Sequence, residues 1–214
     1  MLALGGAAAS GASAHSFIWK VAGAKLEAGK TKEITAKVKT GSRYILKGTA
    51  IGIKTEVECT SQKLKAGSTI IGGTPGTSEE TLELENCKAL KPSGCTGVKV
   101  AATPAKNEIV EIASNKKLGI LFKPKTGTVF TTISFEGCLL NIKAEVTGSA
   151  VAEVGSEETE ATTGTLIFPS TQIKEIVKSN GTKEATGLKF AGNEATIAGE
   201  TTSELSPSAA FGVF

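Results

Sequence analysis

The sequence lacks aspartate and contains a single histidine, His15, so all 21 of its acidic residues are glutamate. Without aspartate the chain can form neither a Ser-His-Asp triad, nor the catalytic loop of a protein kinase, nor an EF-hand calcium loop. Without a second histidine it cannot form the multi-histidine sites that hold catalytic zinc. We therefore expect a protein that is not an enzyme, with no catalytic residue, no cofactor and no metal ion.

Aromatic residues are also scarce, at 5% of the chain, although 40% of the residues are hydrophobic. The core must therefore consist mainly of aliphatic side chains and threonine. A net charge of +3 and a single arginine, Arg43, give no indication of a nucleic-acid partner. The densest basic stretch is formed by Lys116, Lys117, Lys123 and Lys125. We interpret it as the solvated rim of a hairpin, with a polyanion contact as the alternative.

The N-terminal segment indicates export. Residues 1–14, MLALGGAAASGASA, are small and uncharged and end in the A-x-A pattern that signal peptidase reads. We interpret them as a signal-peptide remnant that precedes a single β domain at 15–214; the alternative is an unstructured terminus. No apolar run approaches the roughly 18 residues of a transmembrane helix. The expected location is therefore secreted, extracellular or at the cell surface.

Apolar and polar residues alternate with period 2 along most of the chain, as at 51–59, 81–85 and 138–147. Clusters of Gly, Pro, Asn and Ser separate these runs. The pattern predicts an all-β fold, either a two-layer sandwich or a flattened barrel. We expect about ten to fourteen short, mainly antiparallel strands and at most one short helix.

Three segments depart from this alternation. Residues 171–179 place Ile173, Ile176 and Val177 at helical spacing, which predicts a short helix, although a strand fits nearly as well. Residues 67–78 and 153–163 are rich in turn-forming or acidic residues. Their composition predicts the least ordered parts of the domain.

Four cysteines, Cys59, Cys87, Cys95 and Cys138, form an even set without a C-x-x-C motif. In an exported chain such a set indicates two disulfides. Alternation places Cys59 and Cys138 on apolar strand faces, and it places Cys87 on a polar face near Cys95. We therefore favour the pairs Cys59–Cys138 and Cys87–Cys95, with Cys59–Cys87 and Cys95–Cys138 as the alternative.

Several segments carry a pattern that resembles a family of exported Thr/Gly-rich proteins of Thermoleophilia- and Solirubrobacter-type actinobacteria. The matching segments are TEVECTS at 55–61, LELENCK at 82–88, GCTG at 94–97, NEIVEI at 107–112, LGILFKP at 118–124, TGTVFTTISF at 126–135 and VTGSAVA at 146–152. The resemblance covers roughly residues 50–205. It implies a secreted β protein held by disulfides, and it brings no functional residues with it.

Other candidate site residues each have a simpler interpretation. Glu153, Glu157, Glu158 and Glu160 could hold Ca²⁺, but a solvated acidic loop is favoured. His15 has no ligand partner in the sequence and is interpreted as a bystander. Buried at the start of the first strand, Trp19 would anchor the core, with carbohydrate stacking as the alternative.

These observations favour a non-enzymatic exported domain that acts as a cell-surface or extracellular structural or interaction protein. The partner is unknown, and a cell-envelope glycan or protein is a candidate. One alternative is a carbohydrate- or small-ligand-binding module. The other is a glycoside hydrolase that uses a pair of glutamates in an apolar pocket.

Overall fold

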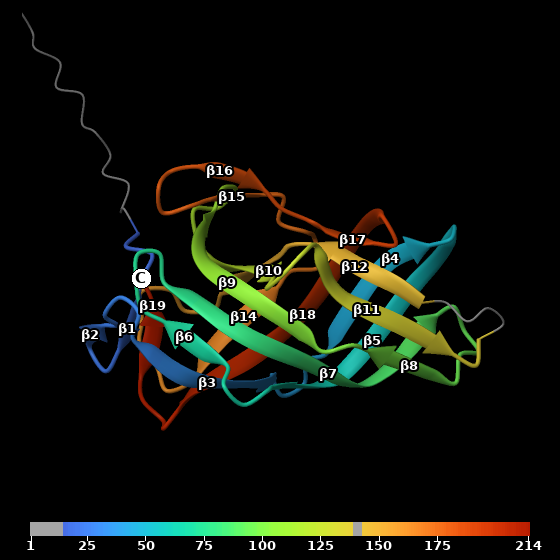
Figure 1. Cartoon of the computed structure of the whole chain (residues 1–214), viewed down its shortest axis with the longest axis horizontal. Coiled ribbons are helices and arrows are strands. Elements are labelled where there is room, and N and C mark those ends of the chain that lie inside the picture. The colour runs from blue at the N-terminus through green and yellow to red at the C-terminus, as the bar shows by residue number, and fades with distance from the viewer. Residues whose placement is uncertain (1–14, 139–142) are drawn as a thin grey trace, which may run out of the picture.

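A computed structural model describes residues 15–138 and 143–214, and this part of the chain contains 19 β-strands and no helix (Figure 1). The expected all-β class is confirmed. Twelve of the strands have four or more residues, and the others are short pieces of two or three residues. The expected signal-peptide remnant at 1–14 lies outside the described residues.

Sixteen of the strands form one continuous antiparallel sheet that closes on itself. Its two longest members, β7 (Thr77–Lys91) and β18 (Asn193–Ser206), belong to two successive rings of strands. The first ring runs, in order of pairing, through β3 (Thr31–Val38), β6 (Thr69–Ile71), β7, β9 (Thr103–Ile112), β10 (Leu118–Pro124), β13 (Ala150–Val154), β14 (Gly164–Phe168) and β18, which pairs with β3. Every neighbouring pair in this ring has a registered ladder, so the first ring is fully closed.

The second ring shares β7 and β18 and continues the same wall. It runs through β4 (Tyr44–Ala50), β5 (Ile53–Leu64), β7, β8 (Gly97–Val100), β11 (Val129–Glu136), β12 (Lys143–Gly148), β17 (Leu188–Phe190) and β18, which pairs with β4. In the described residues β7 and β8 are neighbours without a ladder, and this is the single unpaired junction of the two rings. The molecule is therefore a long flattened barrel.

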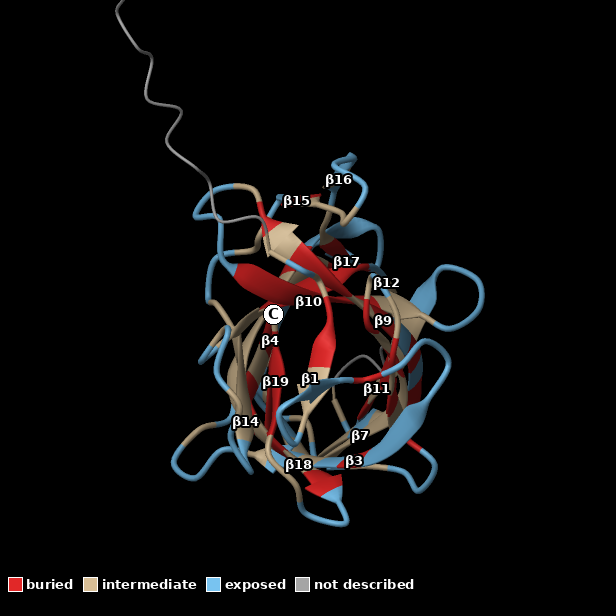
Figure 2. Cartoon of the chain, turned by 90° about the vertical axis from the view of Figure 1, so that its left-hand side faces the viewer, coloured by how far each residue is buried: buried red, intermediate tan, exposed pale blue. Residues whose placement is uncertain are grey.

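A separate three-stranded sheet, the cap, lies at the end of the barrel formed by the first ring. It consists of β1 (Trp19–Val21), β2 (Ala24–Lys25) and β19 (Phe211–Val213). Figure 2 looks into the barrel from this end, with β1 and β19 in front of the opening. The Trp19 indole donates a hydrogen bond of 2.9 Å to the Thr77 carbonyl, which ties the cap to β7.

The main core lies inside the barrel because alternation directs every second side chain inward. A second, smaller core lies outside the barrel wall, where Val110, Ile112, Leu121 and Val151 project from β9, β10 and β13 against Ile176. Ile176 belongs to the hairpin of β15 (Glu175–Val177) and β16 (Lys183–Ala185), which pairs with β9.

The predicted helix at 171–179 is therefore wrong. The apolar side chains Ile173 and Ile176 do face the protein, but strand pairing with Ile112 satisfies the backbone of β15. A helix would have left the edge of β9 at this point without its hydrogen-bonding partner.

The favoured disulfide pairing is also wrong, and the alternative is correct: the bonds are Cys59–Cys87 and Cys95–Cys138. Cys59 and Cys87 lie directly opposite each other in the β5–β7 ladder. Asn86 has a positive φ of 52°, which interrupts the alternation of β7. Cys87 consequently packs against the core, as Leu84 does, instead of lying on the polar face.

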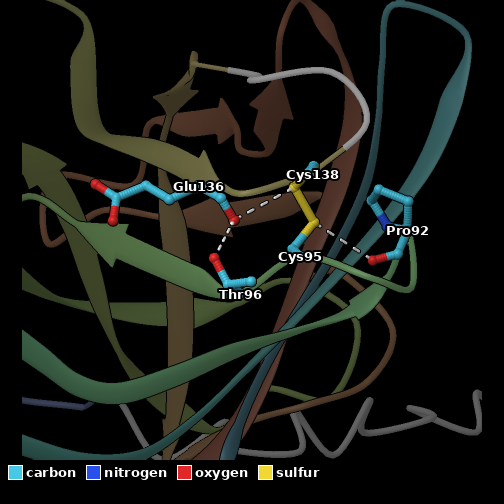
Figure 3. The surroundings of a disulfide bond; sticks show 5 residues. All are labelled: Pro92, Cys95, Thr96, Glu136 and Cys138. Carbon is cyan, nitrogen blue, oxygen red and sulfur yellow. Dashed lines mark hydrogen bonds between the residues drawn. A yellow bond between two sulfur atoms is a disulfide. The ribbon is translucent and has the colours of Figure 1, made fainter.

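The second disulfide closes the end of the β8–β11 ladder (Figure 3). The last registered pair of that ladder is Gly97 with Glu136, and each cysteine lies two residues beyond it. The Thr96 hydroxyl donates a 3.3 Å hydrogen bond to the Glu136 carbonyl beside the disulfide. The alternation at 138–147, which placed Cys138 on an apolar face, includes residues 139–142, and these lie outside the described part.

Candidate functional site

The candidate site is a cavity of about 140 Å³ inside the barrel. Strands of both rings and of the cap contribute its wall, which is mostly apolar. Six of the ten aromatic side chains of the sequence also line it: Trp19, Tyr44, Phe122, Phe130, Phe168 and Phe211. In a chain with few aromatic residues, this concentration makes the cavity the chemically most distinctive place in the molecule.

One carboxyl group, that of Glu80, lies in this apolar wall. Strand alternation places it there, because Ser78, Glu80 and Leu82 all follow the inward period of β7. No lysine, arginine or histidine is among the described residues that line the cavity. Glu80 is likewise not part of any ion pair in the part of the chain that the structure covers.

A short hydrogen-bond chain holds the Glu80 carboxyl in position. The Ser78 hydroxyl donates to Glu80 Oε1 at 2.8 Å and accepts from the Asn107 side-chain amide at 2.9 Å. Ser78 and Asn107 lie opposite each other in the β7–β9 ladder, so the backbone pairing sets this geometry. The carboxyl is thereby oriented, and no cation of the described residues neutralises it.

Burial raises the pKa of the Glu80 carboxyl, because the apolar surroundings disfavour its charged form, and hydrogen bonds from Ser78 and Asn107 oppose this effect only in part. Burial likewise raises the pKa of Tyr44, which lies in the same cavity wall, and the charge of Glu80 adds to the rise. Ionised Glu80 and ionised Tyr44 are therefore both disfavoured in the empty cavity.

Two amide oxygens near this region have no hydrogen-bond donor in the described structure. They belong to Gln62, which lines the cavity and is 7% exposed, and to Asn107, which is 1% exposed. Buried polar groups normally find a partner. Of these two residues, Gln62 is the one that lines the cavity.

The acidic residues of segment 153–163 do not converge on one point, as a calcium site would require. Glu157 accepts from the Leu118 amide at 2.7 Å, whereas Glu160 accepts from the Gly23 amide at 2.8 Å. Glu158 contacts His15 at 3.3 Å, and the other ring nitrogen of His15 is 2.8 Å from the Lys116 carbonyl. The segment therefore fastens the cap to the barrel, and His15 takes part in this contact.

The remaining sequence candidates have structural positions. Lys116, Lys117 and Lys125 each pair with a glutamate, at N–O distances of 3.1, 3.7 and 2.7 Å, and Lys123 pairs with Glu184. They lie at the two ends of the β9–β10 hairpin, which agrees with the interpretation as a solvated rim. Trp19 is 6% exposed and belongs to the core, as expected of an anchor.

Sequence reasoning missed Glu80, although a signal for it exists. Glu80 has the same parity as Leu82 and Leu84, which the alternation assigns to the apolar face of β7. With 21 glutamates in the chain, a single carboxylate on an apolar face was the feature to look for.

No family model, no curated protein and no solved structure matches this chain. Within the described residues there is no helix that could span a bilayer. Functional inference therefore depends on the cavity. Glu80 is the only glutamate in its described lining, so this pocket has no second carboxylate for a paired-glutamate hydrolase mechanism.

Proposed function

We propose that this protein is an exported, non-enzymatic β-domain that binds a small, mainly apolar molecule inside its barrel. The observation that carries the proposal is the apolar, aromatic-lined cavity with one oriented carboxyl. Ligand sites typically combine an apolar wall with a few well-placed polar groups. Among the functions expected from the sequence, small-ligand binding is the one that this geometry supports best.

The size of the cavity limits the ligand. An engineered apolar cavity of about 150 Å³ stays dry and accepts benzene. The cavity of this barrel has about the same volume, 140 Å³. A ligand about the size of a single small ring fits it, whereas a sugar chain does not.

A direct test is NMR titration of the methyl-labelled protein with cyclopentanol, a small ring with one polar group. We expect saturable shifts of the methyl groups of Ile120, Leu82 and Ile197, which line the cavity. In A105L the larger side chain should occupy the space beside Glu80, because Ala105 faces Glu80 in the β7–β9 ladder and also lines the cavity.

The matched control is K106A, because Lys106 is the next residue of β9 and is exposed. Saturable binding by the wild type and K106A, and its loss in a folded A105L, would support the proposal. Absence of saturable shifts in the wild type would contradict it.

The export part of the proposal is supported by the two disulfides, which persist mainly in oxidising compartments. The expected signal remnant at 1–14 and the resemblance to exported actinobacterial proteins support the same location. Cell fractionation with intact-mass measurement tests it. We expect extracellular or cell-surface protein with both disulfides formed, whereas cytoplasmic protein that retains Met1 would contradict export.

A cell-surface structural or interaction role extends this proposal and has the same requirement for export. Incubation of the folded domain with isolated cell walls tests it, with the disulfide-reduced chain as the control. Retention of only the folded domain by the walls would support a surface partner, and no retention would contradict it.

A further inference from the structure

We propose that the molecule bound in the barrel is a small primary or secondary amine, held as an ammonium ion by the Glu80 carboxylate and the surrounding aromatic rings. This inference rests on the proposed function, since it names the ligand class of the same cavity. Its first basis is a carboxyl that has no counter-charge in the described structure. Glu80 is half-buried in this apolar wall. A carboxylate without a cation is costly there, and an ammonium ligand would supply the missing charge.

The second basis is the hydrogen-bonding capacity of the Glu80 carboxyl, to which the Ser78 hydroxyl donates at Oε1. An ammonium group is a pure donor with several N–H bonds, as in the lysine side chain. A ligand with only acceptor groups would offer the carboxylate no hydrogen bond.

The third basis is the aromatic wall. Tyr44 and Phe168 lie with ring centroids 5.8 Å apart, and Phe168 and Phe122 lie 5.3 Å apart. All three rings line the cavity that holds Glu80. Aromatic faces attract organic cations, and this attraction increases when the cation is removed from water. A cavity with these rings and one acid therefore favours an ammonium ion over a neutral ligand of equal size.

Binding would change the protonation of the site in a defined way. In the empty cavity burial raises the pKa of Glu80 and so favours its neutral acid. When an ammonium ion enters, the carboxyl gives its proton to the solvent and becomes a carboxylate, and the ammonium keeps its own protons. One proton is released for each ligand bound, and the N–H···O hydrogen bonds of the ion pair form in its place. The other titratable side chain in the described cavity wall is Tyr44, which stays neutral throughout.

Cyclopentylamine and cyclopentanol form a matched pair of probes for calorimetry, since they have the same ring and the same number of non-hydrogen atoms. At neutral pH we expect the amine to bind the wild type at least about tenfold more tightly, which corresponds to about 1.4 kcal/mol. In E80Q this preference should disappear, so that the two probes bind with affinities within about threefold of each other.

Proton release is measured on the unaltered protein by repeating the amine titration in buffers of different ionisation enthalpy. We expect a buffer dependence that indicates up to one proton for each amine, and none for cyclopentanol. This measurement remains decisive if E80Q fails to fold. Equal binding of the two probes, or amine binding without proton release, would overturn the amine inference and leave the proposed function intact. If neither probe binds, the proposed function itself fails.

Discussion

Glu79 and Glu80 are adjacent in β7, yet their surroundings shift the pKa values of the two carboxyl groups in opposite directions. Glu79 lies on the outer side, where a 2.7 Å hydrogen bond from Lys125 lowers the pKa of its carboxyl. Glu80 faces the cavity, where burial raises the pKa of its carboxyl above the ordinary value of 4.5. The same side chain thus has two electrostatic environments one residue apart.

This difference predicts an unusual pH dependence of stability. Above the ordinary carboxyl pKa the unfolded chain releases the Glu80 proton while the folded protein retains it. The free energy of unfolding therefore falls as pH rises, until the raised pKa of the folded state is passed. Relative to E80Q, the wild type should lose up to about 1.4 kcal/mol per pH unit in this interval. Urea unfolding between about pH 5 and pH 8 measures it.

E79Q is the matched control. The lowered pKa of Glu79 stabilises the folded state above the ordinary pKa, and this contribution is lost as pH falls through the folded-state value. In E79Q the free energy of unfolding should therefore fall less than in the wild type as pH drops below the ordinary carboxyl pKa. The fall in stability with rising pH, which Glu80 causes, should stay unchanged. If the free energies of unfolding of the wild type and E80Q change with pH in parallel, the raised pKa of Glu80 is contradicted.

At the level of elements, the Cys95–Cys138 disulfide should control a more local part of the barrel than Cys59–Cys87. Strand β8 has four registered pairs with β11 and no ladder with β7. The β5–β7 ladder around Cys59 has eight registered pairs. A strand with one short ladder depends more on its covalent link than a strand that is paired along its length.

We expect C95A/C138A to increase amide hydrogen exchange in β8 and β11 more than in any other described strand. In the chain-entropy model each disulfide contributes about 4 kcal/mol, because the loops of 28 and 43 residues differ little in closure entropy. C59A/C87A is the comparison variant, and it should leave exchange in β8 nearly unchanged. Exchange that rises uniformly over the barrel in C95A/C138A would contradict this view.

The alternation of apolar and polar residues predicted where the strands lie better than it predicted which strands pair with each other. Alternation identified most of the longer strands, since it reflects a direct physical requirement of a half-buried strand. It placed Cys87 on the wrong face because Asn86 adopts a positive φ that no local hydrophobic pattern records. At 171–179, the three apolar residues fit a helix and a strand almost equally, and pairing with β9 decided between them. Ring closure depends on contacts between distant strands, which one sequence does not specify.

At the scale of the whole molecule, the cap and the barrel are joined by close packing at Gly76. This residue directly precedes β7, and its amide donates a 2.7 Å hydrogen bond to the Phe17 carbonyl. A Cβ atom there would lie 2.6 Å from Trp19 Cδ1 and 2.8 Å from Ile109 Cδ1. Both neighbours belong to the main core, so neither can move into solvent. The close approach of the cap to the cavity wall therefore requires glycine at this position.

G76A should consequently separate the cap from the barrel and destabilise the protein by about 1–3 kcal/mol, the usual cost of overpacking a core. Its matched control is G97A, because a Cβ at Gly97 would lie 3.5 Å from its nearest neighbour, a side-chain oxygen of Glu136. Thermal unfolding measures the loss, and tryptophan fluorescence reports the cap, since Trp19 is the only tryptophan. We expect G76A alone to lower the melting temperature and shift the emission to longer wavelength.

Because Trp19 and Phe211 also line the cavity, G76A should weaken binding of cyclopentanol as well. An unchanged emission in G76A would show that the cap does not depend on this contact.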